Sequence, residues 1–186
     1  HTVRTLERLG VSAIVIEDKN GLKRNSLHDK PEEHTQDDPA IFASKIKAGI
    51  NARVSDQFMV IARIESLILG KGQSDALERA KTYLDAGVSA IMIHSKDKSG
   101  VDVKEFAEAY NKLENRKPLM MIPTSYNKIT EADLSSWGAN IIVYANHLLR
   151  AAYPAMEHAA ESILKNQRAF ETDSSSIPIE EFLKLA

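Results

Sequence analysis

The sequence predicts an α/β fold built from repeated strand–helix units, and three observations predict it. A motif of Gly, a β-branched run and a polar residue occupies residues 10–17 and is repeated at 87–94, with a less similar copy at 138–144. These apolar runs are continuous rather than alternating, which is typical of strands covered on both faces, as in parallel sheets. Helical patterns with their own start signals separate the runs. We therefore expect a parallel sheet whose strands are joined by helices.

The first units begin in helical sequence. Residues 3–9 carry apolar positions at helical spacing and end at a glycine, directly before the first predicted strand at 10–17. An Asp-Pro pair opens the next helix, over 38–49, because Asp caps the first-turn amides and Pro fits the first turn. The second strand is predicted at 58–63.

The later units repeat this order. The remaining predicted elements are a helix at 73–86, a strand at 87–94, a helix at 101–113, a strand at 119–124, a short helix after Thr130, a strand at 138–144 and a helix at 146–167. The short helix is predicted because the spacing of Thr130 and Asp133 resembles a capping box. Pro154 predicts a kink or a restart in the last helix.

Five strands are too few to close a barrel, and this number bears on the choice between two architectures. A closed (β/α)8 barrel needs eight strands and about 250 residues. We expect the last five βα units of such a TIM-type barrel over residues 1–170, with three more units of roughly 25–30 residues each before His1. Residues 171–186 are then a linker and a C-terminal helix. The alternative is an open, doubly wound sheet, which is less favoured because no Gly-x-Gly-x-x-Gly follows the first strand.

Composition and charge exclude several classes of function. The 186 residues hold 24 Lys and Arg against 26 Asp and Glu, a net charge of −2, whereas nucleic-acid binding usually shows a basic excess. The apolar runs are too short to span a bilayer. Because there is no Cys, disulfides, thiolate metal sites and a cysteine nucleophile are excluded. We expect a cytoplasmic protein that acts on a small molecule, without nucleic-acid or membrane partners.

Polar side chains follow the predicted strands at their carboxyl ends, which is where barrels of this type carry their chemistry. Glu17, Arg63, His94, Thr124 and Asn146 occupy these positions. An arginine at the end of a buried strand needs an anionic partner or a route to water. A phosphate or carboxylate ligand would match the bidentate geometry of the Arg63 guanidinium.

A purely structural interpretation of the same residues is also open. Arg63 and Glu65 can pair with Glu17 and Lys96 in an ion network that caps the barrel, and His94 can be a hydrogen-bonded histidine of the rim. The convergence of all these groups on one face favours a functional site.

A long polar segment separates the first strand from the next helix. It runs from residue 18 to residue 38, whereas most βα loops have 2 to 6 residues. Lys23, Arg24 and Asn25 are suited to grip an anion and to exclude water when such a loop closes. The alternative is a solvated insertion, which we expect for residues 31–38.

Several motifs together resemble a known family. They are Glu17-Asp18-Lys19-x-x-x-Lys23-x-Asn25-Ser26-Leu27, Ile61-Ala62-Arg63-Ile64-Glu65-Ser66, Ile93-His94-Ser95-Lys96, Ile122-Pro123-Thr124-Ser125-Tyr126 and Tyr144-Ala145-Asn146-His147-x-x-Arg150-Ala151. In this order they resemble the lid and the later strand ends of the phosphoenolpyruvate mutases. These enzymes belong to the isocitrate lyase and phosphoenolpyruvate mutase superfamily of barrels.

The resemblance implies an Mg²⁺-dependent phosphomutase that interconverts phosphoenolpyruvate and phosphonopyruvate, forming or breaking a C–P bond in phosphonate biosynthesis. By the same resemblance, Glu17 holds the water shell of the metal. Arg63 and His94 bind and orient the transferring phosphoryl group. Lys23 and Asn25 are lid residues that close on it.

Further site residues follow from the same resemblance. Ser26 and Thr124 are implied to bind substrate together with Arg63, His94 and Asn25. The catalytic aspartate, the direct metal-ligating aspartate and the substrate-carboxylate loop of the family lie before the region where this sequence starts. We therefore expect a truncated enzyme, which would be inactive as 186 residues alone.

Other activities of the superfamily are separated by the lid. The isocitrate and methylisocitrate lyases carry Lys-Lys-Cys-Gly-His there, whereas this chain has no Cys. The phosphonopyruvate hydrolases typically carry Thr at the position of Asn25, so Asn25 favours the mutase and leaves the hydrolase as the alternative. Gly21-Leu22 replaces the usual Phe-Pro, which should loosen the lid. An alternative of another class is a silent barrel that binds a small carboxylate or only assembles.

The C-terminal helices are more than a barrel needs. Their apolar residues within 177–183 must bury one face against something, and a partner subunit is one candidate. The superfamily typically exchanges a C-terminal helix between paired barrels. We expect a homodimer or homotetramer with such an exchange.

Overall fold

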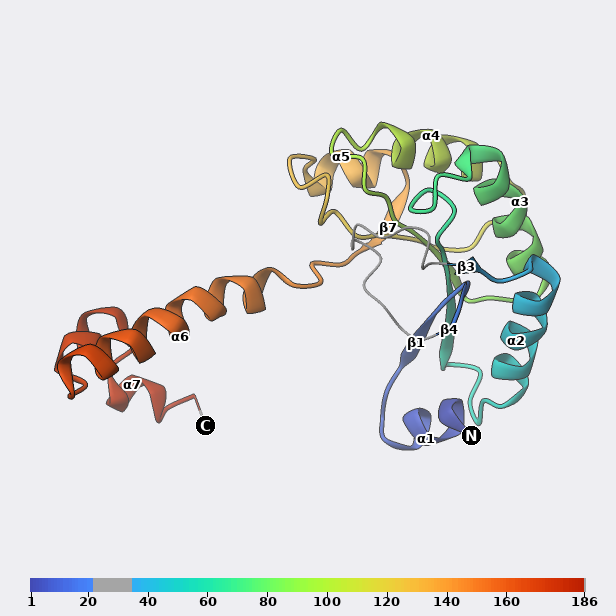
Figure 1. Ribbon diagram of the computed structural model, residues 1–186. Helices are drawn as coiled ribbons and strands as arrows, with labels where there is room; N and C mark the ends of the chain where they lie inside the picture. Colours follow the sequence, from blue (N-terminus) through green and yellow to red (C-terminus); the bar gives the residue numbers. More distant parts are fainter. Residues whose placement is uncertain (22–34, 186) are drawn as a thin grey trace. The chain divides into compact units, whose positions relative to one another are not determined.

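The computed structural model describes residues 1–21 and 35–185, and its main element is a five-stranded parallel sheet (Figure 1). The strands are β1 Ala13–Glu17, β4 Met59–Ile64, β5 Ala90–Ile93, β6 Leu119–Met121 and β7 Ala139–Ile142. Their order across the sheet, β1-β4-β5-β6-β7, is also their order along the chain. A doubly wound sheet requires a point where this order reverses, so that alternative is wrong. The arrangement is that of consecutive units of a (β/α)8 barrel, and the sheet of the described chain is not closed.

The helices between the strands lie on one face of the sheet, as Figure 1 shows for α2 to α5. The helices of this part are α1 Thr2–Arg8, α2 Pro39–Asn51, α3 Gly72–Asp85, α4 Val101–Tyr110 and α5 Glu131–Ser136. Two of them start at the predicted caps. Asp38 accepts hydrogen bonds from the amides of Ala40 and Ile41 at 2.9 and 3.1 Å, and Thr130 forms a reciprocal capping box with Asp133.

The core has two layers because successive strand residues point to opposite faces. On the outer face, Ile64, Ile93 and Met121 pack against the helices together with Phe42 and Tyr83. On the inner face a separate apolar cluster forms. Its buried members are Ile61, Ala90, Met92, Met120 and Ile122. The continuous apolar runs of the sequence thus reflect a sheet with apolar residues on both faces, as expected for parallel strands.

A small second sheet lies beyond β1 and is absent from the sequence-based prediction. In it, β2 Lys19–Asn20 pairs antiparallel with β3 Thr35–Gln36, so that Lys19 lies opposite Gln36. These two strands stand at the ends of the segment that we predicted as a long loop. Residues 22–34, which include Lys23, Asn25 and Ser26, lie outside the described residues.

The structure divides the chain into two compact units, residues 1–144 and 145–186. The second unit contains α6 His147–Asn166, the 3-10 helix η2 Phe170–Ser175 and α7 Ile179–Phe182. The helix α6 continues through Pro154, so the predicted restart does not occur. The sequence placed the division after residue 170 instead, and this assignment of 1–170 to the barrel stays a prediction. Among the described residues, none of the helices combines the length and the apolar character needed to cross a bilayer.

Candidate active site

Strand alternation brings the predicted site residues to one face of the sheet. Glu17 is the last residue of β1 and lies opposite Arg63 of β4 in the parallel register. Arg63 in turn lies opposite Met92 of β5, which places His94 beside Glu65. All of these side chains share the parity of the inner-face residues Ile61 and Met92, so they continue the inner apolar layer into a polar layer at the carboxyl ends of the strands.

Three of these side chains and Lys19 of β2 form a closed ring of alternating charges, which we call the charge ring: Glu17, Arg63, Glu65 and Lys19. Arg63 Nε lies 2.5 Å from Glu65 Oε1, and Arg63 Nη1 lies 3.4 Å from Glu17 Oε1. Lys19 Nζ closes the ring at 3.5 Å from Glu65 Oε2 and 3.8 Å from Glu17 Oε2. An ion network such as the sequence offered as its structural alternative therefore exists, and Lys19 is a cation in it.

The charge ring is only slightly open to solvent. The Glu65 side chain is 0% exposed, and those of Glu17 and Arg63 are 14% and 15% exposed. Partial burial strengthens charge interactions relative to water, and it also makes each unpaired charge costly. The guanidinium of Arg63 lies closer to Glu65, at 2.5 Å, than to Glu17, at 3.4 Å.

His94 is buried next to this ring and is held neutral. Burial, and after it the positive charge of Arg63, lowers its pKa to about 4. Its Nδ1 is a buried nitrogen with no hydrogen-bond partner among the described residues. A neutral imidazole offers one N–H donor and one acceptor nitrogen, so an unsatisfied ring nitrogen beside Arg63 is suited to a polar ligand.

Behind the ring, on the outer face of the sheet, lies a fully buried carboxyl group. Asp18 accepts hydrogen bonds from the Tyr83 hydroxyl at 2.8 Å and from the Glu65 amide at 2.9 Å. Burial raises the pKa of Asp18 to about 6, and these hydrogen bonds oppose the rise. The Arg79 guanidinium lies 3.3 Å away and adds a positive charge.

Three of these residues, Arg79, Tyr83 and Lys19, went unnoticed at the sequence level. Arg79 lies on a helix and is 4% exposed, and the signal that could have found it is the spacing of Asp75, Arg79 and Tyr83, four residues apart beside the apolar stripe. Lys19 stood inside the predicted lid motif without a role. Its place opposite Glu65 depends on β2, which the sequence does not indicate.

The remaining predicted site residues are not part of the charge ring. Thr124 follows β6 at the same edge of the sheet, two strands away from Arg63 in the strand order, and is half-buried. Asn146 belongs to the second unit. Lys23, Asn25 and Ser26 fall on residues that the structure does not describe, so their roles stay predictions.

The residues at this edge fit a divalent cation only in part. Glu17, the last residue of β1, offers a carboxylate at this edge, and an ionised carboxylate has about four acceptor sites. It can therefore accept hydrogen bonds from metal-bound water. In the described ranges, no group of three or more His, Cys, Asp or Glu side chains could by itself hold a metal ion. Among these residues, Glu17 is thus suited to hold a metal ion through the water molecules bound to the ion.

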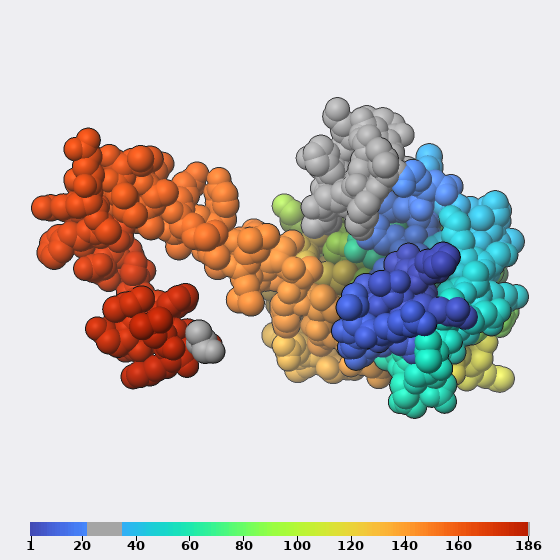
Figure 2. Space-filling view, turned by 90° about the horizontal axis from the view of Figure 1, so that it is seen from below, coloured from blue at the N-terminus to red at the C-terminus, as the bar shows by residue number. Residues whose placement is uncertain are grey.

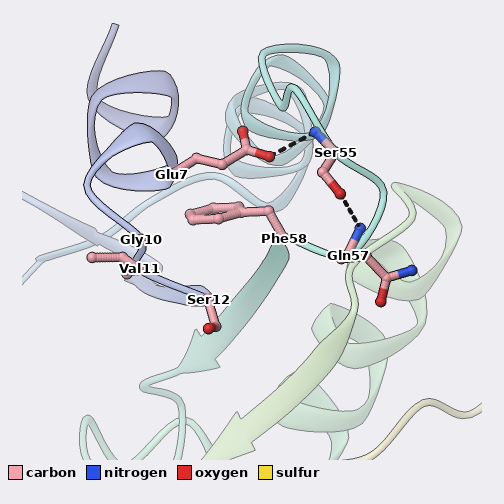
Figure 3. Close-up of a pocket in the computed structure, with 7 residues that line it drawn as sticks. All are labelled: Glu7, Gly10, Val11, Ser12, Ser55, Gln57 and Phe58. Carbon is pink, nitrogen blue, oxygen red and sulfur yellow. Dashed lines mark hydrogen bonds between the residues drawn. The ribbon is translucent and has the colours of Figure 1, made fainter.

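A surface pocket of about 190 Å³ lies at the other end of the sheet, at the amino ends of β1 and β4 (Figure 3). Glu7 accepts hydrogen bonds there from the amides of Val54 and Ser55, both at 2.6 Å. Figure 2 shows α1, in dark blue, lying against the residues that follow α2. In barrels this end serves stability rather than chemistry, so we assign the pocket no part in the reaction.

Comparisons with known proteins show the family of the chain. The sequence model of the family described as "Phosphoenolpyruvate phosphomutase" matches residues 1–164. The chain belongs to the phosphoenolpyruvate phosphomutase family. Family members of known structure share its fold: the crystal structure of the phosphoenolpyruvate phosphomutase from Streptomyces platensis subsp. rosaceus is 36% identical with a TM-score of 0.92, over 100% of this chain and 63% of that one.

Two further relatives show the range of the family. The phosphoenolpyruvate phosphomutase of Tetrahymena pyriformis is 32% identical over 98% of this chain and 60% of its own length. A phosphonopyruvate hydrolase crystallised in complex with oxalate and Mg²⁺ is 34% identical with a TM-score of 0.84, over 98% of this chain and 61% of that one. The chain thus spans about three fifths of the length of these relatives, and its identity to mutases and to a hydrolase is similar.

Proposed function

We propose that this chain is part of a phosphoenolpyruvate phosphomutase, which interconverts phosphoenolpyruvate and phosphonopyruvate. The observation that carries the proposal is the position of Arg63, held by Glu65 and beside the neutral His94, at the carboxyl end of a parallel sheet. Phosphoryl transfer asks a protein mainly for positioning and for charge stabilisation, which these groups supply.

In this proposal Arg63 anchors the phosphoryl group. Glu65 fixes the guanidinium through its Nε, and substrate oxygens are proposed to bind at the Nη groups. The substrate anion then replaces Glu17 at Nη1, which is the looser of the two contacts. A bidentate contact of this kind orients the group as well as neutralising it.

His94 contributes a hydrogen bond rather than a charge. Burial and the Arg63 charge keep its imidazole neutral at pH 7, so it has one N–H, which meets the Ile122 carbonyl in the structure and would turn to a phosphoryl oxygen when substrate binds. Thr124, at the same edge of the sheet, is proposed to add a hydroxyl contact to the substrate. The lid residues Lys23, Asn25 and Ser26 are proposed to close over it.

Mg²⁺ is the proposed cofactor, and the related hydrolase whose crystal structure contains Mg²⁺ supports this proposal. When bound, the ion would neutralise substrate oxygens as a Lewis acid. In this chain Glu17 would hold it through water, accepting hydrogen bonds from the water shell once the substrate has taken its place on Arg63.

The second candidate is phosphonopyruvate hydrolysis, because a hydrolase is 34% identical over nearly the whole chain. The deciding experiment is ³¹P NMR of the full-length natural protein with Mg²⁺ and phosphonopyruvate. We expect a phosphate-ester signal from phosphoenolpyruvate. Inorganic phosphate as the first product would establish the hydrolase instead, and an unchanged spectrum would favour a barrel without this activity.

The lid provides a second test of the same choice. If Asn25 excludes water as proposed, the substitution Asn25→Thr should shift the products from phosphoenolpyruvate towards pyruvate and phosphate. The product ratio is read from the same ³¹P spectra. Ser26→Ala is the matched control, which should slow both reactions without changing their ratio, and an unchanged ratio in Asn25→Thr would remove the basis for preferring the mutase.

For assembly we propose a homodimer or homotetramer in which the C-terminal helix is exchanged between subunits. The proposal is supported by α6, which has no buried residue in the chain alone although it carries several large apolar side chains. A cytoplasmic location stays a prediction from the sequence.

A further inference from the structure

A buried polar cluster supports the charge ring from the outer face of the sheet. We call it the Asp18 cluster: Asp18, Gln36, Arg79 and Tyr83. The Oδ2 atom of Asp18 accepts hydrogen bonds from the Tyr83 hydroxyl at 2.8 Å, from Gln36 Nε2 at 2.8 Å and from Arg79 Nη1 at 3.3 Å. Asp18 and Tyr83 are 0% exposed and Arg79 is 4% exposed, so these groups depend on one another for hydrogen bonding.

The other oxygen of Asp18 joins two strands. The Asp18 amide donates to the Arg63 carbonyl at 3.1 Å, and the Glu65 amide donates to Asp18 Oδ1 at 2.9 Å. The side chain thus replaces a backbone acceptor one step beyond the end of β1 and continues the ladder between β1 and β4. Because Glu17 and Lys19 flank Asp18 on the opposite face, this link sets their register against Arg63 and Glu65.

The helix α3 holds Asp18 in place through one stripe of residues. Arg79 Nε donates to Asp75 Oδ2 at 2.9 Å, and Arg79 Nη1 also meets the Tyr83 hydroxyl at 3.0 Å. Asp75 in turn accepts from the hydroxyl of Ser66, two residues after β4, at 2.6 Å. One face of α3 is therefore hydrogen-bonded to the residues that follow both strands of the charge ring, β1 and β4.

We propose that Tyr83 and Arg79 are positioning residues, which act through Asp18 to set the geometry of the charge ring and so the placement of Arg63. The inference rests on the proposed function for its kinetic consequence. Neither side chain touches the ring directly, and a buried ion pair adds little stability over apolar packing of the same volume. What this cluster supplies is alignment, and small misplacements of binding groups are costly for catalysis.

The substitution Tyr83→Phe tests the proposal with the least change in shape. Its matched control is Tyr110→Phe: Tyr110 is also a fully buried helical tyrosine, and its hydroxyl bonds the backbone of Lys117 at the amino end of β6, away from the charge ring. We expect Tyr83→Phe to lower kcat about 10-fold with KM changed less than about 2-fold. Tyr110→Phe should leave both constants within about 2-fold, although both variants lose a buried hydrogen-bonding hydroxyl.

A second readout does not depend on the reaction. Amide hydrogen exchange at Glu65 reports its hydrogen bond to Asp18, and exchange there should accelerate in Tyr83→Phe but not in Tyr110→Phe. Arg79→Lys keeps the charge but loses the planar guanidinium, so it should show the same lower kcat and the same faster exchange at Glu65. Equal kcat values for the two tyrosine variants would overturn the positioning role, as would unchanged exchange at Glu65. A wild-type enzyme without turnover, together with the expected exchange pattern, would instead overturn only the proposed function.

Discussion

Arg63 is the residue on which the proposed chemistry depends most, because it is the charge that must change partners when substrate binds. The substitution Arg63→Lys keeps the positive charge but removes the planar fork that meets Glu65 and Glu17 at once. We expect turnover to fall at least about 100-fold in Arg63→Lys, and further in Arg63→Ala.

The measurement is steady-state turnover of phosphonopyruvate, with far-ultraviolet circular dichroism to verify the fold. Lys81→Arg, at an exposed position of α3, is the control substitution and should be neutral. Wild-type rates in Arg63→Lys would exclude a bidentate anchor at this position.

His94 should make the stability of the protein sensitive to acid. Its folded pKa is about 4, whereas the unfolded value is close to 6.5, so the unfolded state takes up the proton first as pH falls. The free energy of unfolding should therefore decrease between pH 6.5 and 4 by up to about 3 kcal/mol from this residue. In His94→Asn this contribution disappears.

Urea unfolding of the wild type and of His94→Asn at pH 7 and pH 4 gives the difference directly. His158→Asn, which changes an exposed histidine of α6, should follow the wild type at both values. Parallel pH dependences of the wild type and His94→Asn would mean that the pKa of His94 is the same in the folded and the unfolded protein.

At the scale of the elements, the amino end of the sheet is fastened by a contact that has no part in the site. Glu7 of α1 accepts from the amides of Val54 and Ser55, both at 2.6 Å. Glu7→Gln keeps the shape but offers only one acceptor oxygen, so we expect a loss of about 1–2 kcal/mol in the free energy of unfolding with normal turnover.

The same urea titration measures this loss. Glu78→Gln breaks only an exposed pair with Lys81 and should cost less than about 0.5 kcal/mol. If both variants unfold at the same urea concentration, the Glu7 contact does not fasten α1 in solution.

The elements also show which parts of the site a sequence can predict. Strand periodicity places Glu17, Arg63 and His94 on one face at one edge, because parity and parallel order are local properties of the chain. The partners of these residues could not be predicted in the same way. Lys19 reaches Glu65 only because β2 pairs with β3, and Arg79 is buried because its face of α3 meets Asp18, the residue after β1.

For the whole molecule, the apolar surface of residues 145–186 has the character of an interface. Leu149, Met156 and Ile163 recur every seven residues along α6, which places them on one side of the helix, and all three are exposed in the single chain. Large exposed apolar faces of this kind are typical of surfaces that are buried against a partner. If the proposed assembly uses this face, a charge placed in its middle should weaken it.

The substitution Met156→Glu should therefore shift the full-length protein towards smaller species in sedimentation velocity at micromolar concentration. His158→Glu adds the same charge two residues away, on the opposite side of α6, and should keep the wild-type distribution. Because this face is remote in sequence from the charge ring, the first unit of Met156→Glu should retain its fold by circular dichroism. Identical distributions for Met156→Glu and the wild type would show that the subunits meet through another surface, or that the protein does not associate at all.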